Sequence, residues 1–430
     1  MNVIPRAALR TALLVSLITA LVSSTNAAWP VSASDDWPQW RGPNRDGVAS
    51  SYTRPKSWPE QLKRRWKVTV GSGHSSPVVA GGRVYMLTRQ GEEEVVTALD
   101  LSTGRQLWQN KYATVKYAVH EAAREHGDGP KATPVLHGGK LFTLGVTGVI
   151  SAYDAAGGKL LWRKEPVGGL GAAYPRFGMA VSPLVARGVL VAAVGGNRES
   201  AAIAGFDIQT GREKWRWTDN RMHPEDGPEY SSPIMVEVGG APHVVTIGGK
   251  KMVGLAPDTG RVLWQYPFEA DWESTVTPLA HNGLIIASGH AIGMHAVRVS
   301  QRGGAWGVEK VWHNPDLFTF MNSPVTHGDL LYGQAILKKG HYFCADVNTG
   351  KTHWASEGRQ GEHASMIRAG EELFVLTPDA TLTVARSSAK GFEPLRRYQV
   401  ADSPTWAHPV LLDKRMLVKD ATTLTLWSFE

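Results

Sequence analysis

Eight side chains that could take part in binding or catalysis stand at corresponding places along the chain, most of them just before a Ser/Thr-Pro pair. They are His74, Lys131, Met179, Tyr230, Glu273, Asn322, His363 and Trp406. The oxygens of Glu273 and Asn322 are ligands that calcium accepts. Lys131 could bind a carboxylated ligand, and His74 or His363 could act as a base. The alternative is that these residues are the ordinary polar lining of a water-filled channel.

A second group of polar residues lies in the longest stretch between expected strands, 112–130. It contains His120, His126 and Asp128, which are residue types that bind metals. This insertion could form a lid or a metal site. The simpler interpretation, which we favour, is a helical surface loop over 118–126.

A repeat sets the spacing of the eight side chains. Its best copy, Ala98 to Trp108, has the pattern Ala-x-Asp-x-x-Thr-Gly-x-x-x-Trp. Six further copies follow, including one at Trp312 that lacks the Asp and the Thr-Gly pair, and one with Leu395 in place of Trp. The repeat tryptophans, counting an isolated one near the N-terminus, are Trp66, Trp108, Trp162, Trp215, Trp264, Trp312 and Trp354.

Each residue type in the pattern has a mechanical explanation. Glycine can adopt positive φ in the turn before the last strand of a repeat, and the Asp can accept hydrogen bonds from turn amides. The small first residue leaves room for close packing, and Trp supplies a large apolar face with one N–H donor. We therefore interpret the repeat tryptophans as structural. Cys344, at a small first position, is expected to be buried.

The repeats predict an all-β fold, an eight-bladed β-propeller of four-stranded antiparallel blades over 62–430. The eighth copy begins at His408 and stops at Glu430 without its last strand, while 62–70 carries Trp66 without its first three strands. We expect the N- and C-terminal segments to pair and close the ring, which removes an exposed sheet edge. The starts of the innermost strands would then gather the eight side chains at the mouth of a central channel.

The segment before the propeller divides into two parts. Residues 1–27 have two arginines, an apolar run over 11–22 and small residues beyond it, which predicts a cleaved signal peptide rather than a membrane anchor. We therefore expect a periplasmic or secreted protein with no membrane span in the mature chain. Residues 28–61 form an N-terminal arm. Its Trp37, Trp40 and Arg41 are expected to dock on the propeller rather than to present a patch to a partner.

Charge and cysteine content narrow the functional classes. The formal net charge is +7, but the densest basic run, 63–65, lies in an expected strand, so we expect no nucleic-acid binding. A single cysteine allows no internal disulfide, and a c-type haem motif is absent from the sequence. We expect a monomer.

The repeat resembles the tryptophan-docking motif of the pyrroloquinoline-quinone-like β-propellers, and the resemblance covers nearly the whole chain after the signal. That family includes quinoprotein dehydrogenases, which use quinone and calcium to oxidise alcohols or sugars, and cofactor-free scaffolds such as the outer-membrane assembly factor BamB. The sequence departs from both kinds. Many of the dehydrogenases place the quinone against a disulfide of adjacent cysteines, which one cysteine cannot form, and no lipid-accepting cysteine follows the signal.

Three functions follow from these features. We favour a non-catalytic binding or scaffold protein of the cell envelope, with an envelope protein or a small molecule as its partner. The alternative is a quinone-dependent oxidoreductase with pyrroloquinoline quinone and calcium at the channel. A hydrolase or lyase that uses His74 and His363 is the third.

Overall fold

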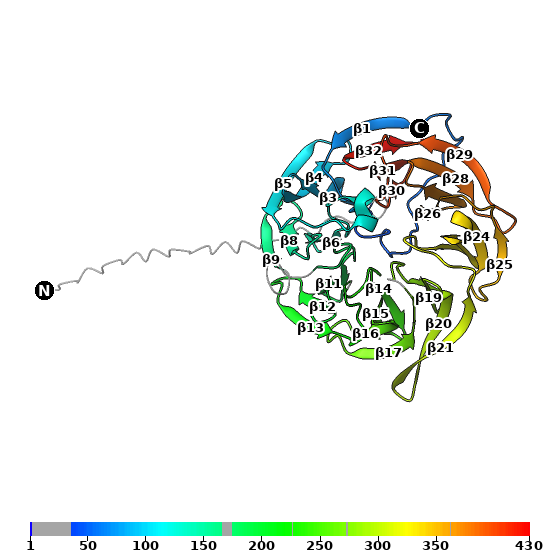
Figure 1. The fold of residues 1–430 in the computed structure, drawn as a ribbon. Helices are drawn as coiled ribbons and strands as arrows, with labels where there is room; N and C mark the ends of the chain where they lie inside the picture. The colour runs from blue at the N-terminus through cyan, green and yellow to red at the C-terminus, as the bar shows by residue number, and fades with distance from the viewer. Residues whose placement is uncertain (2–35, 166–173, 226, 272–273, 362) are drawn as a thin grey trace.

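A computed structural model describes residue 1 and residues 36–165, 174–225, 227–271, 274–361 and 363–430. The predicted signal peptide, 1–27, lies almost entirely outside these residues. Eight four-stranded antiparallel sheets form a ring, each sheet a blade (Figure 1). The predicted eight-bladed β-propeller is therefore confirmed.

The blades follow one another along the chain with short innermost strands. Blades 1 to 4 contain β2 (Val78–Ala80), β3 (Arg83–Gln90), β4 (Glu93–Asp100), β5 (Gln106–Ala113), β6 (Val135–His137), β7 (Lys140–Leu144), β8 (Ile150–Asp154), β9 (Leu160–Lys164), β10 (Leu184–Ala186), β11 (Val189–Val194), β12 (Ala202–Asp207), β13 (Glu213–Trp217), β14 (Ile234–Val238), β15 (Ala241–Gly248), β16 (Lys251–Leu255) and β17 (Val262–Pro267). Blades 5 to 8 contain β18 (Leu279–His281), β19 (Leu284–Gly289), β20 (Gly293–Arg302), β21 (Ala305–Asn314), β22 (Val325–His327), β23 (Leu330–Ala335), β24 (His341–Asp346), β25 (Thr352–Ala355), β26 (Ser365–Ala369), β27 (Glu372–Leu376), β28 (Thr381–Arg386), β29 (Glu393–Gln399), β30 (Val410–Leu412), β31 (Arg415–Lys419), β32 (Thr423–Ser428) and β1 (Lys63–Thr69).

The repeat tryptophans link neighbouring blades. Trp108 in β5 lies opposite Ala98 in β4, just after a bulge. Its Nε1 donates to the carbonyl oxygen of Ala155 in blade 2, at 3.1 Å. The same bond to the next blade is made by Trp66, Trp162, Trp215, Trp312 and Trp354. Cys344 occupies the small position opposite Trp354 and is buried, as expected.

Blade 5 lacks the Thr-Gly turn, and its last two strands form a long hairpin, β20–β21, that projects from the ring (Figure 1). Trp264 of blade 4 therefore has a different partner. Its Nε1 donates to Nδ1 of His243 in its own blade, at 2.9 Å, and Trp306 of the long hairpin covers that imidazole with the ring centroids 4.4 Å apart.

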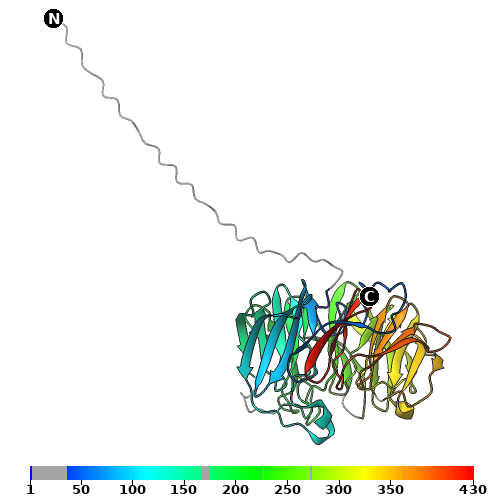
Figure 2. The same cartoon turned by 90° about the horizontal axis from the view of Figure 1, so that it is seen from above.

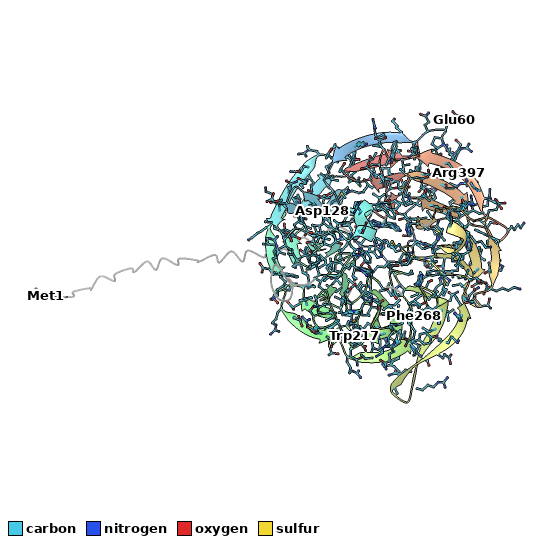
Figure 3. The ribbon with its side chains drawn as sticks, in the orientation of Figure 1. Met1, Glu60, Asp128, Trp217, Phe268 and Arg397 are labelled. Atoms are coloured by element: carbon cyan, nitrogen blue, oxygen red, sulfur yellow. The ribbon has the colours of Figure 1, made fainter. Side chains whose placement is uncertain are left out.

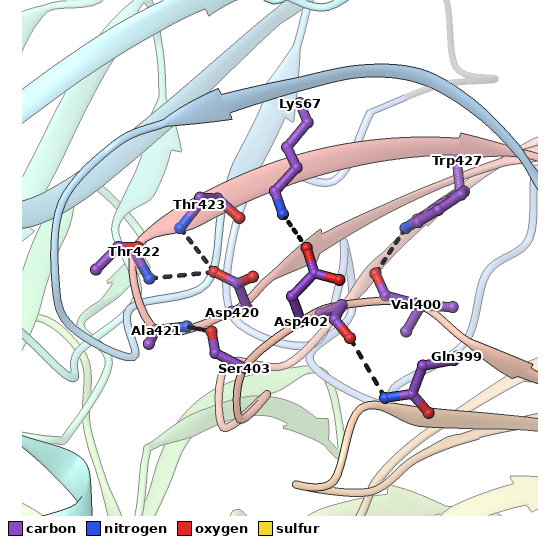
Figure 4. A network of polar contacts seen from close by, with 11 residues as sticks. Lys67, Gln399, Val400, Asp402, Ser403, Asp420, Ala421, Thr422, Thr423 and Trp427 are labelled. Carbon is purple, nitrogen blue, oxygen red and sulfur yellow. Dashed lines mark hydrogen bonds and ion pairs between the residues drawn. The ribbon is translucent and has the colours of Figure 1, made fainter.

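Blade 7 corrects one detail of the repeat. We expected Leu395 in the position of the tryptophan, but Leu395 lies at the bulge. Arg396 is the residue opposite Val384. The contact between blades 7 and 8 comes instead from Trp427 in β32, whose Nε1 donates to the carbonyl oxygen of Val400 at 3.0 Å (Figure 4). The repeat alignment did not identify this tryptophan.

The ring closes as the sequence predicts. The N-terminal strand β1 pairs antiparallel with the C-terminal strand β32, with Trp66 opposite Leu426. An ion pair of 2.6 Å between Lys67 and Asp402 joins β1 to the segment that follows blade 7 (Figure 4). The ends of the chain thus share one blade.

The two faces of the ring differ. A short 3-10 helix, η1 (Glu121–His126), projects from one face, whereas the C-terminus lies on the other (Figure 2). In the view along the ring, Asp128 beside η1 lies well inside the outer strands, while Arg397 lies near the rim (Figure 3). No helix among the described residues has the length and apolar character that a membrane crossing requires.

Candidate functional site

The segments that precede the innermost strands meet at the face of the ring that carries η1, which we call the channel mouth. Glu273 lies outside the described residues, so the predicted calcium pair with Asn322 is not described. Asn322 itself is buried, and its Nδ2 donates to the carbonyl oxygen of Phe320 at 3.0 Å. Met179 is 2% exposed in the hydrophobic core of blades 2 to 4, so it is a packing residue.

Three of the predicted residues meet in one cluster. The ring of Trp406 lies 5.2 Å from that of His363 and 6.5 Å from that of His74, measured between centroids. His126, at the end of η1, completes the group at 4.3 Å from Trp406 and 5.5 Å from His74. We call these four residues the histidine–tryptophan cluster.

Two histidines of this cluster, His74 and His126, are poorly suited to act as bases. Burial, together with the charges of the nearby His126, Lys419 and Lys131, lowers the pKa of His74 to about 3. Burial likewise lowers the pKa of His126 to about 4. A base with a pKa of about 3 binds a proton poorly at neutral pH. His74 Nε2 and Trp406 Nε1 are buried without a hydrogen-bond partner, so they are the polar atoms at which a water or a ligand group would bind.

Two further predicted residues meet at Phe177, which sequence analysis missed. Lys131 donates from Nζ to the carbonyl oxygen of Phe177 at 2.6 Å and lies 5.3 Å from the ring centroid of Tyr117. The hydroxyl of Tyr230 accepts from the amide of Phe177 at 3.0 Å. Burial lowers the pKa of Lys131 to about 8. We call Phe177, Lys131, Tyr230 and Tyr117 the Phe177 cluster. The polar groups of Lys131 and Tyr230 bond to the backbone of Phe177 within this cluster.

The insertion forms a cover over the mouth, with the predicted helix present as η1. His120 packs on Phe177 at 5.3 Å, His126 packs on Trp406, and Asp128 pairs with Arg89 at 3.2 Å. The three predicted metal ligands therefore face different partners. Within the described part of the chain, no group of three or more His, Cys, Asp or Glu residues is arranged to hold a metal ion.

The N-terminal arm, described from Asp36 onward, enters the ring from the other face. Trp37 is buried and exchanges two backbone hydrogen bonds with Val79 of β2, at 2.8 and 2.9 Å. The Nε1 of Trp40 donates to Thr277 Oγ1 at 2.9 Å, just before blade 5. The arm therefore docks on the propeller, as expected, and it does so inside the channel, against the innermost strand β2.

Two buried arginines fix the arm between opposite sides of the ring. Arg41 donates to the carbonyl oxygen of Pro324, before blade 6, at 2.6 Å. Arg45 donates to the carbonyl oxygens of Ser182 and Pro183, before blade 3, at 2.8 Å each. Burial lowers the pKa of Arg41 to about 10 and that of Arg45 to about 9, so both remain charged at neutral pH. The arm fills the channel to the level of the Ser-Pro pairs.

The family model that matches this chain is described as outer membrane protein assembly factor BamB, and it matches residues 59–126 and 92–356. The chain belongs to this BamB family. A BamB from Burkholderia pseudomallei (strain K96243) is 30% identical over 211 residues, which are 48% of this chain and 46% of that relative. The match thus spans less than half of the relative's length.

Solved structures share the fold of this BamB-family chain. BamB from Moraxella catarrhalis has a TM-score of 0.62 and 14% identity, covering 86% of this chain and 98% of that one. A quinohemoprotein alcohol dehydrogenase from Comamonas testosteroni has a TM-score of 0.65 and 16% identity, covering 94% of this chain and 81% of that one. At identities this low, the similarity shows a shared fold, and function must be argued from the residues of the site.

Proposed function

We propose that this BamB-family protein is a non-catalytic binding scaffold of the cell envelope, exported to the periplasm or secreted, and that it binds through its outer surfaces. The observation that carries this proposal is the N-terminal arm. Arg41 and Arg45 span the channel from blade 6 to blade 3, so the chain itself occupies the space where a propeller ligand would otherwise lie. The relative named as an outer membrane protein assembly factor supports an envelope protein as the partner.

The mouth does not fit a bound quinone in this conformation. A flat cofactor needs an open aromatic face, but Trp406 is surrounded by the rings of His126, His363 and His74 at 4.3 to 6.5 Å. Lys131, the cation suited to a carboxylated ligand, donates to a backbone carbonyl oxygen within the Phe177 cluster. A quinone would have to displace η1 first.

The alternative function, a quinone-dependent oxidoreductase acting on alcohols or sugars, has one specific observation in its favour. The unpartnered Nε1 of Trp406 and Nε2 of His74 lie at the mouth, next to a cover formed by a single short helix. If η1 moved away, these atoms and Lys131 would face the channel and could bind a polar ligand.

One experiment separates the two functions. Purified protein is mixed with pyrroloquinoline quinone and calcium, and its melting temperature and dye reduction with alcohols and sugars are measured. The scaffold proposal predicts no change in melting temperature and no turnover. Binding tighter than about micromolar with turnover would overturn it. In a parallel arm, crosslinking in intact cells should trap an envelope protein.

A further inference from the structure

Three loops of blade 6 form a basic and apolar patch on the face that carries the channel mouth. We call its exposed residues, Met321, Leu337, Lys338, Lys339 and Arg359, the blade 6 patch. The loops are bonded to one another. The amide of Ile336 donates to the carbonyl oxygen of Phe318 at 2.9 Å, and the amide of Arg359 donates to that of Lys338 at 3.0 Å. The patch is therefore one surface built from three parts of the chain.

The composition of the patch is unusual for a solvent-exposed surface. Met321 is 46% exposed and Leu337 is 40% exposed, which places both among the few large apolar side chains exposed in the described chain. Lys338, Lys339 and Arg359 form no ion pair within the described residues. Although Glu357 lies in the same loop, the described side chains leave the patch net positive. Exposed apolar side chains that lie together mark protein-binding surfaces, in which Met and Arg are enriched.

Backbone strain is concentrated at the same place. Four of these residues adopt the left-handed conformation, with φ of 54° at Met321, 58° at Lys338, 61° at Lys339 and 66° at Arg359. Each such non-glycine residue costs about 1 kcal/mol or more, and strain of this kind gathers at functional sites. Surrounding hydrogen bonds hold this conformation. For example, the amide of Gly340 donates to the carbonyl oxygens of Ile336 and Leu337, at 3.1 Å each.

We propose that the blade 6 patch binds an acidic, extended segment of a partner protein, with an apolar side chain of that segment between Met321 and Leu337. The proposal rests on the proposed scaffold function and names the chemistry of its partner. Charge complementarity decides the occupant, because carboxylates would pair with the three free cations. A flat anionic membrane fits less well, since η1 projects from the same face and carries the exposed Glu121 and Glu125 (Figure 2).

The test measures binding of a fluorescent synthetic peptide of alternating glutamate and leucine by anisotropy, using the full-length exported protein. The variant K338N/K339N removes two charges and keeps residues that tolerate positive φ. The matched control, K214N/K250N, removes two exposed lysines elsewhere, one of which, Lys250, has φ of 59°. We expect Kd to rise about tenfold for K338N/K339N, to rise several-fold for L337S, and to stay within about twofold for the control.

The outcomes separate this inference from the scaffold function. Equal peptide affinity in K338N/K339N and in the control would contradict the proposal that the blade 6 patch binds an acidic segment. The proposal would also be wrong if the wild-type protein did not bind the peptide but bound vesicles rich in anionic lipid, and if K338N/K339N lost that vesicle binding. If envelope crosslinks persist in K338N/K339N, the proposal for the blade 6 patch is wrong but the scaffold function is not. If the protein turns over substrate with quinone, the scaffold function is wrong, while peptide binding by the patch is not contradicted. Unchanged melting temperatures check that the variants fold.

Discussion

His408 is a single side chain whose burial links stability to pH. It lies between the N-terminal arm and blade 8, with its ring 5.4 Å from that of Trp40. Burial, aided by the charge of Arg41, lowers the pKa of His408 from 6.5 to about 4. The unfolded chain therefore binds a proton here below about pH 6.5, while the folded chain does so only near pH 4. The free energy of unfolding should fall by about 3 kcal/mol through this window as the pH drops.

The variant H408Q tests that contribution. Urea unfolding of wild type and H408Q between pH 6.5 and pH 4.5 should show a slope that is shallower in the variant by at most about 1.4 kcal/mol per pH unit. The exposed His353 provides the control, and H353Q should keep the wild-type slope. An identical slope in H408Q and wild type would mean that the folded protein protonates His408 as readily as the unfolded chain does.

The turn of each repeat is the element that joins one blade to the next, and Gly260 tests it. This glycine has φ of +68°, and a Cβ there would lie 2.5 Å from the ring of Trp215 in the preceding blade. G260A should therefore combine left-handed strain with overpacking against the indole, at a total cost of about 2 to 4 kcal/mol. Thermal or urea unfolding measures the loss.

A matched glycine separates the two causes. Gly283 has φ of +74°, and a Cβ there would meet nothing within 4 Å. G283A should therefore lose only about 1 kcal/mol, from the backbone alone. Equal losses in G260A and G283A would show that the approach of the turn to the indole adds nothing to the stability of the ring.

The sequence could predict those elements whose residues interact with near neighbours in the chain. The Asp and Thr-Gly residues of each turn interact within a few positions, so Asp207 accepting from Thr210 N at 2.9 Å follows from the pattern itself. The β20–β21 hairpin has lost that pattern, and its length was not predictable. The contact of His126 with Trp406 joins residues far apart in sequence, so only the folded ring brings them together. The spacing of the repeats therefore predicted which segments gather at the channel mouth, but it did not predict which side chains contact one another there.

At the scale of the whole molecule, both ends of the channel are covered by segments outside the repeats. η1 covers the mouth through His120 and His126, and the N-terminal arm fills the channel from the other face. The ring closes through the pairing of β1 with β32, whereas Arg41 and Arg45 of the arm hold the channel. We therefore expect that weakening the arm will not open the ring.

The variant R41A/R45A tests this separation. Both guanidinium groups donate to carbonyl oxygens of blades 3 and 6, and their removal would leave those buried acceptors unpaired, at about 1 to 3 kcal/mol each. We expect a lower melting temperature, faster proteolysis within the arm and a red-shifted tryptophan emission as Trp37 and Trp40 become exposed, while the β-sheet circular dichroism is kept. R298A, which breaks an ion pair to Glu309 between side chains 50% and 60% exposed in the β20–β21 hairpin, should change stability by no more than about 1 kcal/mol. Loss of the β-sheet signal in R41A/R45A would instead mean that the arm is needed to keep the eight blades closed.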